Sequence, residues 1–306
     1  MNDDCPALGW FEKVSDVRWQ GKYHVEPIHV NRNRGSYWSA EGGADPTAGN
    51  QVIENFRIPC RYMHGSVRMT VQAIKASQSD KGAFARIMRL EMDRLLDDMR
   101  VSRNFAIWGD GRGVRALASA AGAASGVTEV DSPGNVAGAT HGTRFLNVGD
   151  NVCAIVPGTG ALSSAGTWLI TAINPDGTDF TADSTTANID DNDYIVKAFG
   201  ADTTLDIQDT DFDHVAMGLR GIVDSGAVLN SYFGLSRVTY PILQSYVLGS
   251  VGALSADVIY RAIDTVGSVG RAKINKHCMS YDTRRALLAI MENDRRYSHE
   301  FLMKPD

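Results

Sequence analysis

Two glycine-rich segments contain the residue types that could bind a phosphate group. Gly109–Gly113 reads GDGRG and Gly158–Gly160 reads GTG, and clustered glycines let backbone N–H groups approach an anion. The first segment follows a predicted helix, where a phosphate-binding loop follows a strand, and it lacks the Gly-Lys-Ser/Thr ending. The second lacks the third glycine and the helix of a nucleotide-binding fingerprint. Both segments therefore predict tight turns, and we expect no cofactor.

The histidines and cysteines do not have the spacing that metal binding or nucleophilic catalysis requires. His24 and His29 lie five residues apart on a predicted strand and so point to opposite faces, a poor geometry for one metal ion. His277 and Cys278 are neighbours on a predicted strand and also face apart. The cysteines form no CxxC pair: Cys5, Cys60, Cys153 and Cys278. No GxSxG or HExxH motif occurs, so we expect no catalytic residue, no metal site and no disulfide framework.

A cluster of five aspartates could coordinate calcium, because hard cations collect carboxylate ligands. The cluster consists of Asp202, Asp206, Asp209, Asp211 and Asp213. The glycine and the terminal glutamate of an EF-hand loop are missing, which favours a solvated acidic loop. The wider segment 174–214 holds eleven aspartates and one lysine, whereas residues 215–306 hold eleven Lys and Arg against eight Asp and Glu. The charge is therefore divided by region.

The composition is that of a globular protein. The chain has 306 residues, a formal net charge of −6, 43% hydrophobic and 22% charged residues, which suits one large domain or two to three small ones. A protein that mainly binds nucleic-acid phosphates needs more positive than negative charge, so the composition does not favour a nucleic-acid-binding protein. No apolar run reaches the length of a membrane span, and the start MNDDCPALGW is acidic where a signal peptide is basic. We expect a cytosolic location.

A long amphipathic helix is the strongest local pattern. Ser79 and Asp80 are suitable N-cap residues, no glycine or proline occurs between Gly82 and Gly109, and the GDG turn ends the helix after Trp108. The predicted core of this helix is an apolar stripe of Phe84, Met88, Met92, Leu95 and Met99. Arg86, Arg89, Asp93, Asp97 and Arg100 follow the opposite side. At about 1.5 Å per residue the helix would run about 43 Å, as a strut.

A long hairpin is predicted before this helix. Residues 21–31 form one strand, which Pro27 makes an edge or irregular strand, and residues 56–72 form the other, with a β-bulge near His64 where the alternation changes phase. Residues 32–51 between them are rich in Gly, Asn and Ser and form the tip. A two-stranded arm of this length has little core of its own.

A β module and a mixed α/β region follow. The module is placed at residues 141–200, with strands over 144–148, 152–156, 167–173 and 193–197. In the last third, Ser255 precedes a helix with Ile259, Ala262, Ile263 and Val266 on one face. Lys273 to Met279 would form a strand, and Asp282 would cap a second helix.

The order of these elements resembles the major capsid protein of tailed bacteriophages, which has the Hong Kong 97 fold. GKYHVEPIHVNRNRG and AEGGADPTAGNQ match the hairpin called the E-loop. SDKGAFARIMRLEMDRLLDDMRVSRNFAIWGDGRG matches the spine helix and its exit, and MGLRGIVDSG matches the return of the chain to the shell domain. The likeness covers about the first 115 residues through these motifs and the rest through its layout.

The resemblance implies an α+β fold with five parts. They are an N-terminal arm (1–20), the E-loop hairpin (21–75), the spine helix and P domain (76–140), an inserted small β domain (141–200), and an α/β A domain with returning parts of the P domain (201–306).

The resemblance also implies a structural virion protein and no enzymatic activity. Such a protein assembles in the host cytoplasm into hexamers and pentamers of an icosahedral shell around packaged double-stranded DNA, which it contacts only weakly and non-specifically. Portal, scaffolding or decoration proteins are further partners that it allows, and no membrane is involved. The negative net charge agrees with this role, because a basic inner wall would condense the genome. The hairpin tip contains no lysine, so we do not expect the covalent crosslinks of the founding member.

The hairpin supplies the expected contacts between subunits, since only a neighbour can cover the apolar face of such an arm. The aromatic residues of the tip and one strand face are the apolar candidates, and two arginines of the opposite face would pair with acidic residues of the next subunit. The full set is Tyr37, Trp38, Phe56, Arg57, Ile58, Arg61 and Tyr62.

Two rival interpretations remain. An encapsulin-like nanocompartment shell protein shares this fold, but it usually lacks an inserted β domain. A β-rich binding protein or hydrolase would need a convergent polar site, and the sequence offers no recognised one.

Overall fold

The computed structural model describes residues 6–12, 14, 19–33, 35–45, 47–68, 70–76, 81–163, 166–199, 206–249, 251–270 and 273–294. The chain divides into two compact units, Met1–Leu243 and Gln244–Asp306. None of the helices in these ranges is long and apolar enough to span a membrane.

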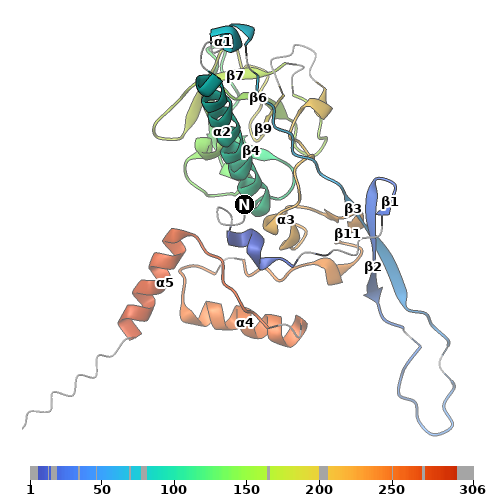
Figure 1. Cartoon of the computed structure of the whole chain (residues 1–306). Coiled ribbons are helices and arrows are strands. Elements are labelled where there is room, and N and C mark those ends of the chain that lie inside the picture. The colour runs from blue at the N-terminus through green and yellow to red at the C-terminus, as the bar shows by residue number, and fades with distance from the viewer. Residues whose placement is uncertain are drawn as a thin grey trace, which may run out of the picture. The chain divides into compact units, whose positions relative to one another are not determined.

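The hairpin is part of a small antiparallel sheet (Figure 1). Its strands are β1 (Trp19–Gln20), β2 (Tyr23–Asn31) and β3 (Val52–Pro59), in that order. Tyr23 lies opposite Pro59, and the register continues to His29 opposite Ile53 before it shifts by one residue. Among the described residues, β1 pairs with Tyr23 and His24 of β2, and Pro27 of β2 lies opposite Asn55 of β3.

The second strand of the hairpin is shorter than predicted. The sequence predicted one kinked strand over residues 56–72, but β3 ends at Pro59, and Val71–Ala76 form the short helix α1. Pro59 has no N–H to donate, and β2 begins at its partner Tyr23, so the ladder has no continuation beyond this pair. The predicted bulge near His64 is therefore wrong, and the register shift lies between His29 and Asn31.

The long helix α2 spans Lys81–Trp108, as predicted, and its 28 residues correspond to about 42 Å. The N-cap residues predicted for it, Ser79 and Asp80, lie outside the described residues. Near its C-terminal end, Phe105 packs edge-to-face against Phe145 at 5.0 Å, and the Arg115 guanidinium lies 4.0 Å from the Phe105 ring. Trp108 contacts Trp10 of the 3₁₀ turn η1 (Pro6–Trp10), with a ring distance of 6.2 Å.

Six antiparallel strands close into a barrel after the long helix (Figure 1). They are β4 (Val114–Ala118), β5 (Val127–Asp131), β6 (Asn151–Ile155), β7 (Trp168–Ile173), β8 (Asp179–Ala182) and β9 (Tyr194–Lys197). Their order around the barrel is β4-β5-β8-β7-β6-β9. Two 3₁₀ turns, η2 (Pro133–Asn135) and η3 (Gly142–Phe145), follow β5.

The barrel has a core on both faces of some strands. On β6, Val152 and Ala154 belong to the interior cluster with Trp168 and Phe180. Cys153 and Ile155 alternate with them and belong to a second cluster outside the barrel. Phe212 is part of this second cluster, because the segment after β9 folds back over the wall. Burial on both faces explains why β6 is an almost continuous apolar run.

The barrel begins earlier than the predicted β module. The strands predicted near residues 152–156, 167–173 and 193–197 are confirmed as β6, β7 and β9, but β4 and β5 lie before residue 141. The strand predicted over 144–148 is wrong, because residues 142–145 form η3 and Leu146 is buried in the barrel core. β4 was not predicted, because the small residues of the sequence ALASAA are not typical of strands. In the barrel, Ala116 and Ala118 fit beside the large interior side chains.

Short elements connect the barrel to the end of the first unit. They are η4 (Ile207–Asp209), α3 (Leu219–Ile222), β10 (Ser231–Tyr232), β11 (Leu235–Ser236) and η5 (Pro241–Leu243). The turn between β10 and β11 consists of Phe233 and Gly234, with φ of 47° and 89°. Two successive positive φ angles are typical of a type I′ hairpin turn.

The second unit contains two helices in its described part, α4 (Ala256–Gly270) and α5 (Tyr281–Asp294). Ser255 precedes α4 as predicted, and it caps the helix, since its Oγ accepts from the Val258 N–H at 3.3 Å. Asp282 is not the cap of α5, because Ser280 Oγ accepts from the Thr283 N–H at 3.2 Å. Residues 273–279 form no strand. None of the described residues in this unit is fully buried.

Candidate functional site

The tip of the hairpin presents aromatic side chains to solvent. Trp38 is fully exposed and Tyr37 is 54% exposed. The loop around them is held by polar contacts, because Asn33 Nδ2 donates to the Gly49 carbonyl at 2.7 Å and the Tyr37 hydroxyl donates to the Ala44 carbonyl. The tip is thus an ordered turn that projects an indole ring, which is a costly arrangement in water unless another surface covers it.

The root of the hairpin packs on its own chain. Phe56 lies edge-to-face against Tyr232 at 5.2 Å and against Phe233 at 6.0 Å. The Arg57 N–H donates to the Phe233 carbonyl at 3.0 Å. Phe56 and Ile58 are half-buried in the single chain. The prediction that this strand face gains cover only from a neighbour is therefore wrong at Phe56, because the β10–β11 turn covers it.

The two arginines predicted to face a neighbour are exposed, but Arg61 acts on an acid of its own chain. Burial raises the pKa of Asp213, and the positive charges of Arg112 and Arg61 oppose this increase. Tyr62, at 76% exposure, stacks on His64 at 6.4 Å. A hydrogen bond with the Cys60 side chain raises the pKa of Tyr62. Tyr62 thus remains accessible, and the charge of Arg61 acts to lower the pKa of Asp213 in the same chain.

The apolar stripe of α2 is only partly covered within the chain. Met88 and Met92 are 43% and 53% exposed, so the prediction that they are core residues is wrong for the single subunit. Leu95 and Met99 are half-buried where the segment after β3 crosses the helix, and a Cβ at Gly65 would lie 3.0 Å from each of their side chains. The side chain of Phe84 lies outside the described part of the chain.

The GDGRG segment is a structural junction between α2 and β4, in agreement with the predicted turn. Asp110 is 4% exposed and accepts from the Arg112 N–H at 3.0 Å and from Asn135 Nδ2 at 3.2 Å. Arg112 donates to the Tyr194 hydroxyl at 2.8 Å and to the Val228 carbonyl at 2.6 Å. Gly113 has a φ of 77°, and a Cβ there would lie 2.5 Å from the Asp211 carbonyl oxygen. The N–H and the guanidinium of Arg112 are therefore engaged within the fold.

The aspartates of the acidic segment have separate structural partners. Asp206 and Asp209 cap η4 reciprocally, and Asp211 accepts from Arg115 at 2.8 Å. Asp202 lies outside the described residues. No group of three or more His, Cys, Asp or Glu side chains in the described ranges is arranged to hold a metal ion.

The other candidates for chemistry are inert or isolated. Cys153 is fully buried, and this burial raises its thiol pKa to about 12. His277 and Cys278 lie exposed in a segment without strand structure. Gly158 and Gly160 form the turn that follows β6, as predicted, with φ of 86° and 67°.

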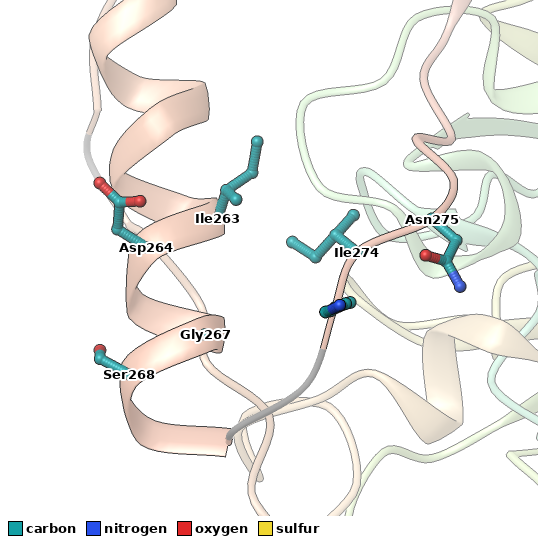
Figure 2. A pocket seen from close by; sticks show the side chains of 7 residues that line it. Ile263, Asp264, Gly267, Ser268, Ile274 and Asn275 are labelled. Carbon is teal, nitrogen blue, oxygen red and sulfur yellow. The ribbon is translucent and has the colours of Figure 1, made fainter.

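An open pocket of about 550 Å³ lies between α4 and the segment that follows it. Figure 2 shows Ile263 and Ile274 facing each other across it, whereas Asp264 and Ser268 point away from Ile274. A ligand site normally joins an apolar wall to converging polar groups. The arrangement here is a gap between two apolar side chains.

The structure contains a buried ion pair that no pattern in the sequence predicts. Arg237 and Asp224 are 0% and 4% exposed, and Arg237 Nη1 lies 2.8 Å from Asp224 Oδ2. The pair lies thirteen residues apart in irregular segments, so no periodicity relates the two residues. A lone arginine among apolar residues in GLSRVTY was the only signal.

Comparison of the chain with protein-family models, with curated proteins and with solved structures finds no match in any of the three.

Proposed function

We propose that this protein is a structural shell subunit of the tailed-bacteriophage major capsid class, with the Hong Kong 97 fold. In this proposal it assembles through copies of itself into hexamers and pentamers of a closed virion shell around double-stranded DNA. The hairpin acts as the arm that reaches a neighbour, and α2 acts as the spine of each subunit.

The observation that carries the proposal is apolar surface that the chain leaves uncovered on the hairpin tip and on α2. Trp38 and Tyr37 project from the hairpin tip, and Met88 and Met92 are exposed on α2. The root of the same hairpin is anchored on the chain through Phe56. An arm that is fixed at its root and exposed at its tip suits a contact with another subunit, where burial would stabilise both partners.

The barrel favours the capsid class over a nanocompartment shell, because an inserted β domain is not usual in the latter. Its surface also suits a virion. Residues 114–199 carry nine Asp and Glu against three Lys and Arg, so the barrel accounts for a charge of −6. A surface with this charge repels the DNA backbone, which agrees with weak and non-specific DNA contact.

Sedimentation velocity across a range of protein and salt concentrations tests the proposal. We expect discrete species of the mass of pentamers, hexamers and larger assemblies, with the monomer dominant only at the lowest concentrations. A monomer at every condition would contradict the proposal. A hydrolytic activity lost through a single substitution would favour the rival class.

A further inference from the structure

We propose that Arg237 is a positioning residue that fixes the direction of the hairpin relative to helix α2. The inference concerns the single subunit and goes beyond the proposed function, because it does not depend on shell formation. It rests on a continuous path of contacts from β3 through Arg237 to the end of α2.

The guanidinium of Arg237 uses all five of its N–H donors. Nη1 donates to Asp224 Oδ2 at 2.8 Å and to the Leu229 carbonyl at 3.0 Å. Nη2 donates to the carbonyls of Gly221 at 2.7 Å and Ile222 at 3.1 Å. Nε donates to the Leu243 carbonyl at 3.2 Å. One side chain thereby joins four carbonyls at three separate places of the backbone and one carboxylate.

Asp224 holds this network in its ionised form. Its carboxylate accepts from the Leu229 N–H at 2.8 Å and from the Val228 N–H at 3.2 Å, besides Arg237. Burial alone would raise the pKa of Asp224, but these backbone hydrogen bonds and the Arg237 charge lower it below the ordinary value. The buried positive charge therefore has a permanent partner at neutral pH.

The first half of the path runs from Arg237 to the hairpin. The guanidinium lies 4.7 Å from the Tyr232 ring, and this ring packs against Phe56 of β3. Two further bonds hold the same strand, from the Arg57 N–H to the Phe233 carbonyl and from the Tyr240 hydroxyl to Glu54 Oε1 at 2.9 Å. Glu54 and Phe56 share one face of β3, so their two side-chain contacts lie on the same side of the hairpin root.

The second half of the path runs from Arg237 to the end of α2. Its acceptors Gly221 and Ile222 belong to α3. The Gly221 N–H donates to the Gly109 carbonyl at 3.4 Å. At Gly218, which precedes α3, a Cβ would lie 2.2 Å from the Ala106 carbonyl oxygen, so α3 approaches α2 too closely for any side chain there. The orientation of α3 is thus fixed on the spine.

This path of contacts connects the hairpin sheet, which has little core of its own, to helix α2. A hairpin of two main strands is marginally stable alone, and its direction depends on what packs at its root. Arginine suits this role because its planar fork fixes the direction of each hydrogen bond, whereas the lysine ammonium holds only a point charge.

The test uses the full-length protein under conditions where it is a single subunit. Spin labels are introduced at Asn55 and Arg89 as non-canonical amino acids, and the distance distribution between them is measured. Amide hydrogen exchange of β2, β3, β6 and β9 is followed in parallel. In Arg237→Lys we expect a broader distance distribution and exchange at least about tenfold faster in β2 and β3, with β6 and β9 unchanged within about twofold.

A second variant and a control separate positioning from folding. Arg237→Met combined with Asp224→Asn removes both charges, leaves no unpaired buried charge, and should loosen the hairpin in the same way. Arg115→Lys alters an Arg–Asp pair of the same 2.8 Å length in the barrel and should leave the hairpin unchanged. If the Arg237 variants do not fold, Tyr240→Phe, which removes only the bond to Glu54, should still speed exchange in β3.

Two outcomes would overturn the inference. An unchanged distance distribution and unchanged exchange in the hairpin of the folded variants would show that Arg237 does not set its direction. Equal acceleration in the hairpin and in the barrel would show that Arg237 only stabilises the whole unit. Neither outcome depends on whether shells form, so failure here is distinct from failure of the proposed function.

Discussion

The contribution of a charged residue to the free energy of unfolding of this chain depends on how deeply the residue is buried. Arg237 and Asp224 are almost inaccessible, and removing one partner of such a pair costs about 3–5 kcal/mol. Arg89 and Asp93 on α2 are largely exposed, and a surface pair of this kind contributes about 0–1 kcal/mol. The predictions at this scale therefore concern two carboxylates whose pKa the fold shifts, the buried Asp224 and the more exposed Asp213.

Asp224→Asn should destabilise the protein in a pH-dependent way. The folded pKa of Asp224 is lowered, so its contribution is complete above the unfolded pKa and is lost as pH falls through the folded value. We expect a loss of about 3–5 kcal/mol in the free energy of unfolding at pH 7. Urea unfolding of both proteins between pH 7 and pH 3 should show this difference shrinking in acid. A difference independent of pH would contradict the assignment.

Asp213→Asn should have the opposite effect. The folded pKa of Asp213 is raised, chiefly by partial burial of its carboxyl, so the ionised form is disfavoured and stability falls as pH rises through the folded value. The position has a φ of 54°, which asparagine tolerates. Thermal unfolding at pH 7 should therefore show a slightly higher Tm, which disappears near pH 3. Asp176→Asn, in an exposed turn, is the control for the loss of one charge, and a lower Tm for Asp213→Asn would count against this account.

Elements that follow a single periodic pattern were predictable from the sequence, and elements that depend on distant partners were not. The stripe of α2 predicted the helix correctly. The end of β3 depends on where β2 begins, which the alternation of residues 56–72 does not reveal. β4 places two alanines, Ala116 and Ala118, in the interior cluster around Trp168, and a strand pattern does not predict alanine at such positions. The Arg237 network has no sequence period at all, so its role follows only from the fold.

Two substitutions in the stripe of α2 should separate folding from association. Leu95 is half-buried beside Gly65, so Leu95→Asp should cost about 2–3 kcal/mol in the free energy of unfolding. Met92 is 53% exposed, so Met92→Asp should cost less than about 1 kcal/mol and instead reduce association. Urea unfolding and sedimentation measure the two effects. Equal losses of stability would show that the helix face is assigned wrongly.

Deletion of the hairpin tip, residues 35–50, should leave a folded subunit that no longer assembles. The described part of the tip makes its hydrogen bonds within itself, whereas the root contacts of Phe56 and Glu54 lie outside the deletion. Circular dichroism should keep the helical signal, while sedimentation should show only small species. Trp38→Ala is the milder variant and should weaken assembly without changing stability. Normal assembly by the deletion variant would remove the arm from the proposed contact.

The two units of the molecule differ in how completely their side chains are buried. The barrel holds two buried clusters, whereas none of the described residues in Gln244–Asp306 is fully buried. Side chains such as Tyr260, Val269 and Leu288 are more than half exposed in that unit. A unit without a closed core depends on further contacts for stability. This is the condition that we propose a shell supplies.

Electron microscopy of the purified full-length protein, at concentrations where sedimentation detects assemblies, tests the central claim most directly. The account predicts closed, uniform shells whose capsomers have five and six subunits, with the hairpin of each subunit lying on its neighbour. Particles without closed symmetry, or a field of single subunits under every condition, would contradict it.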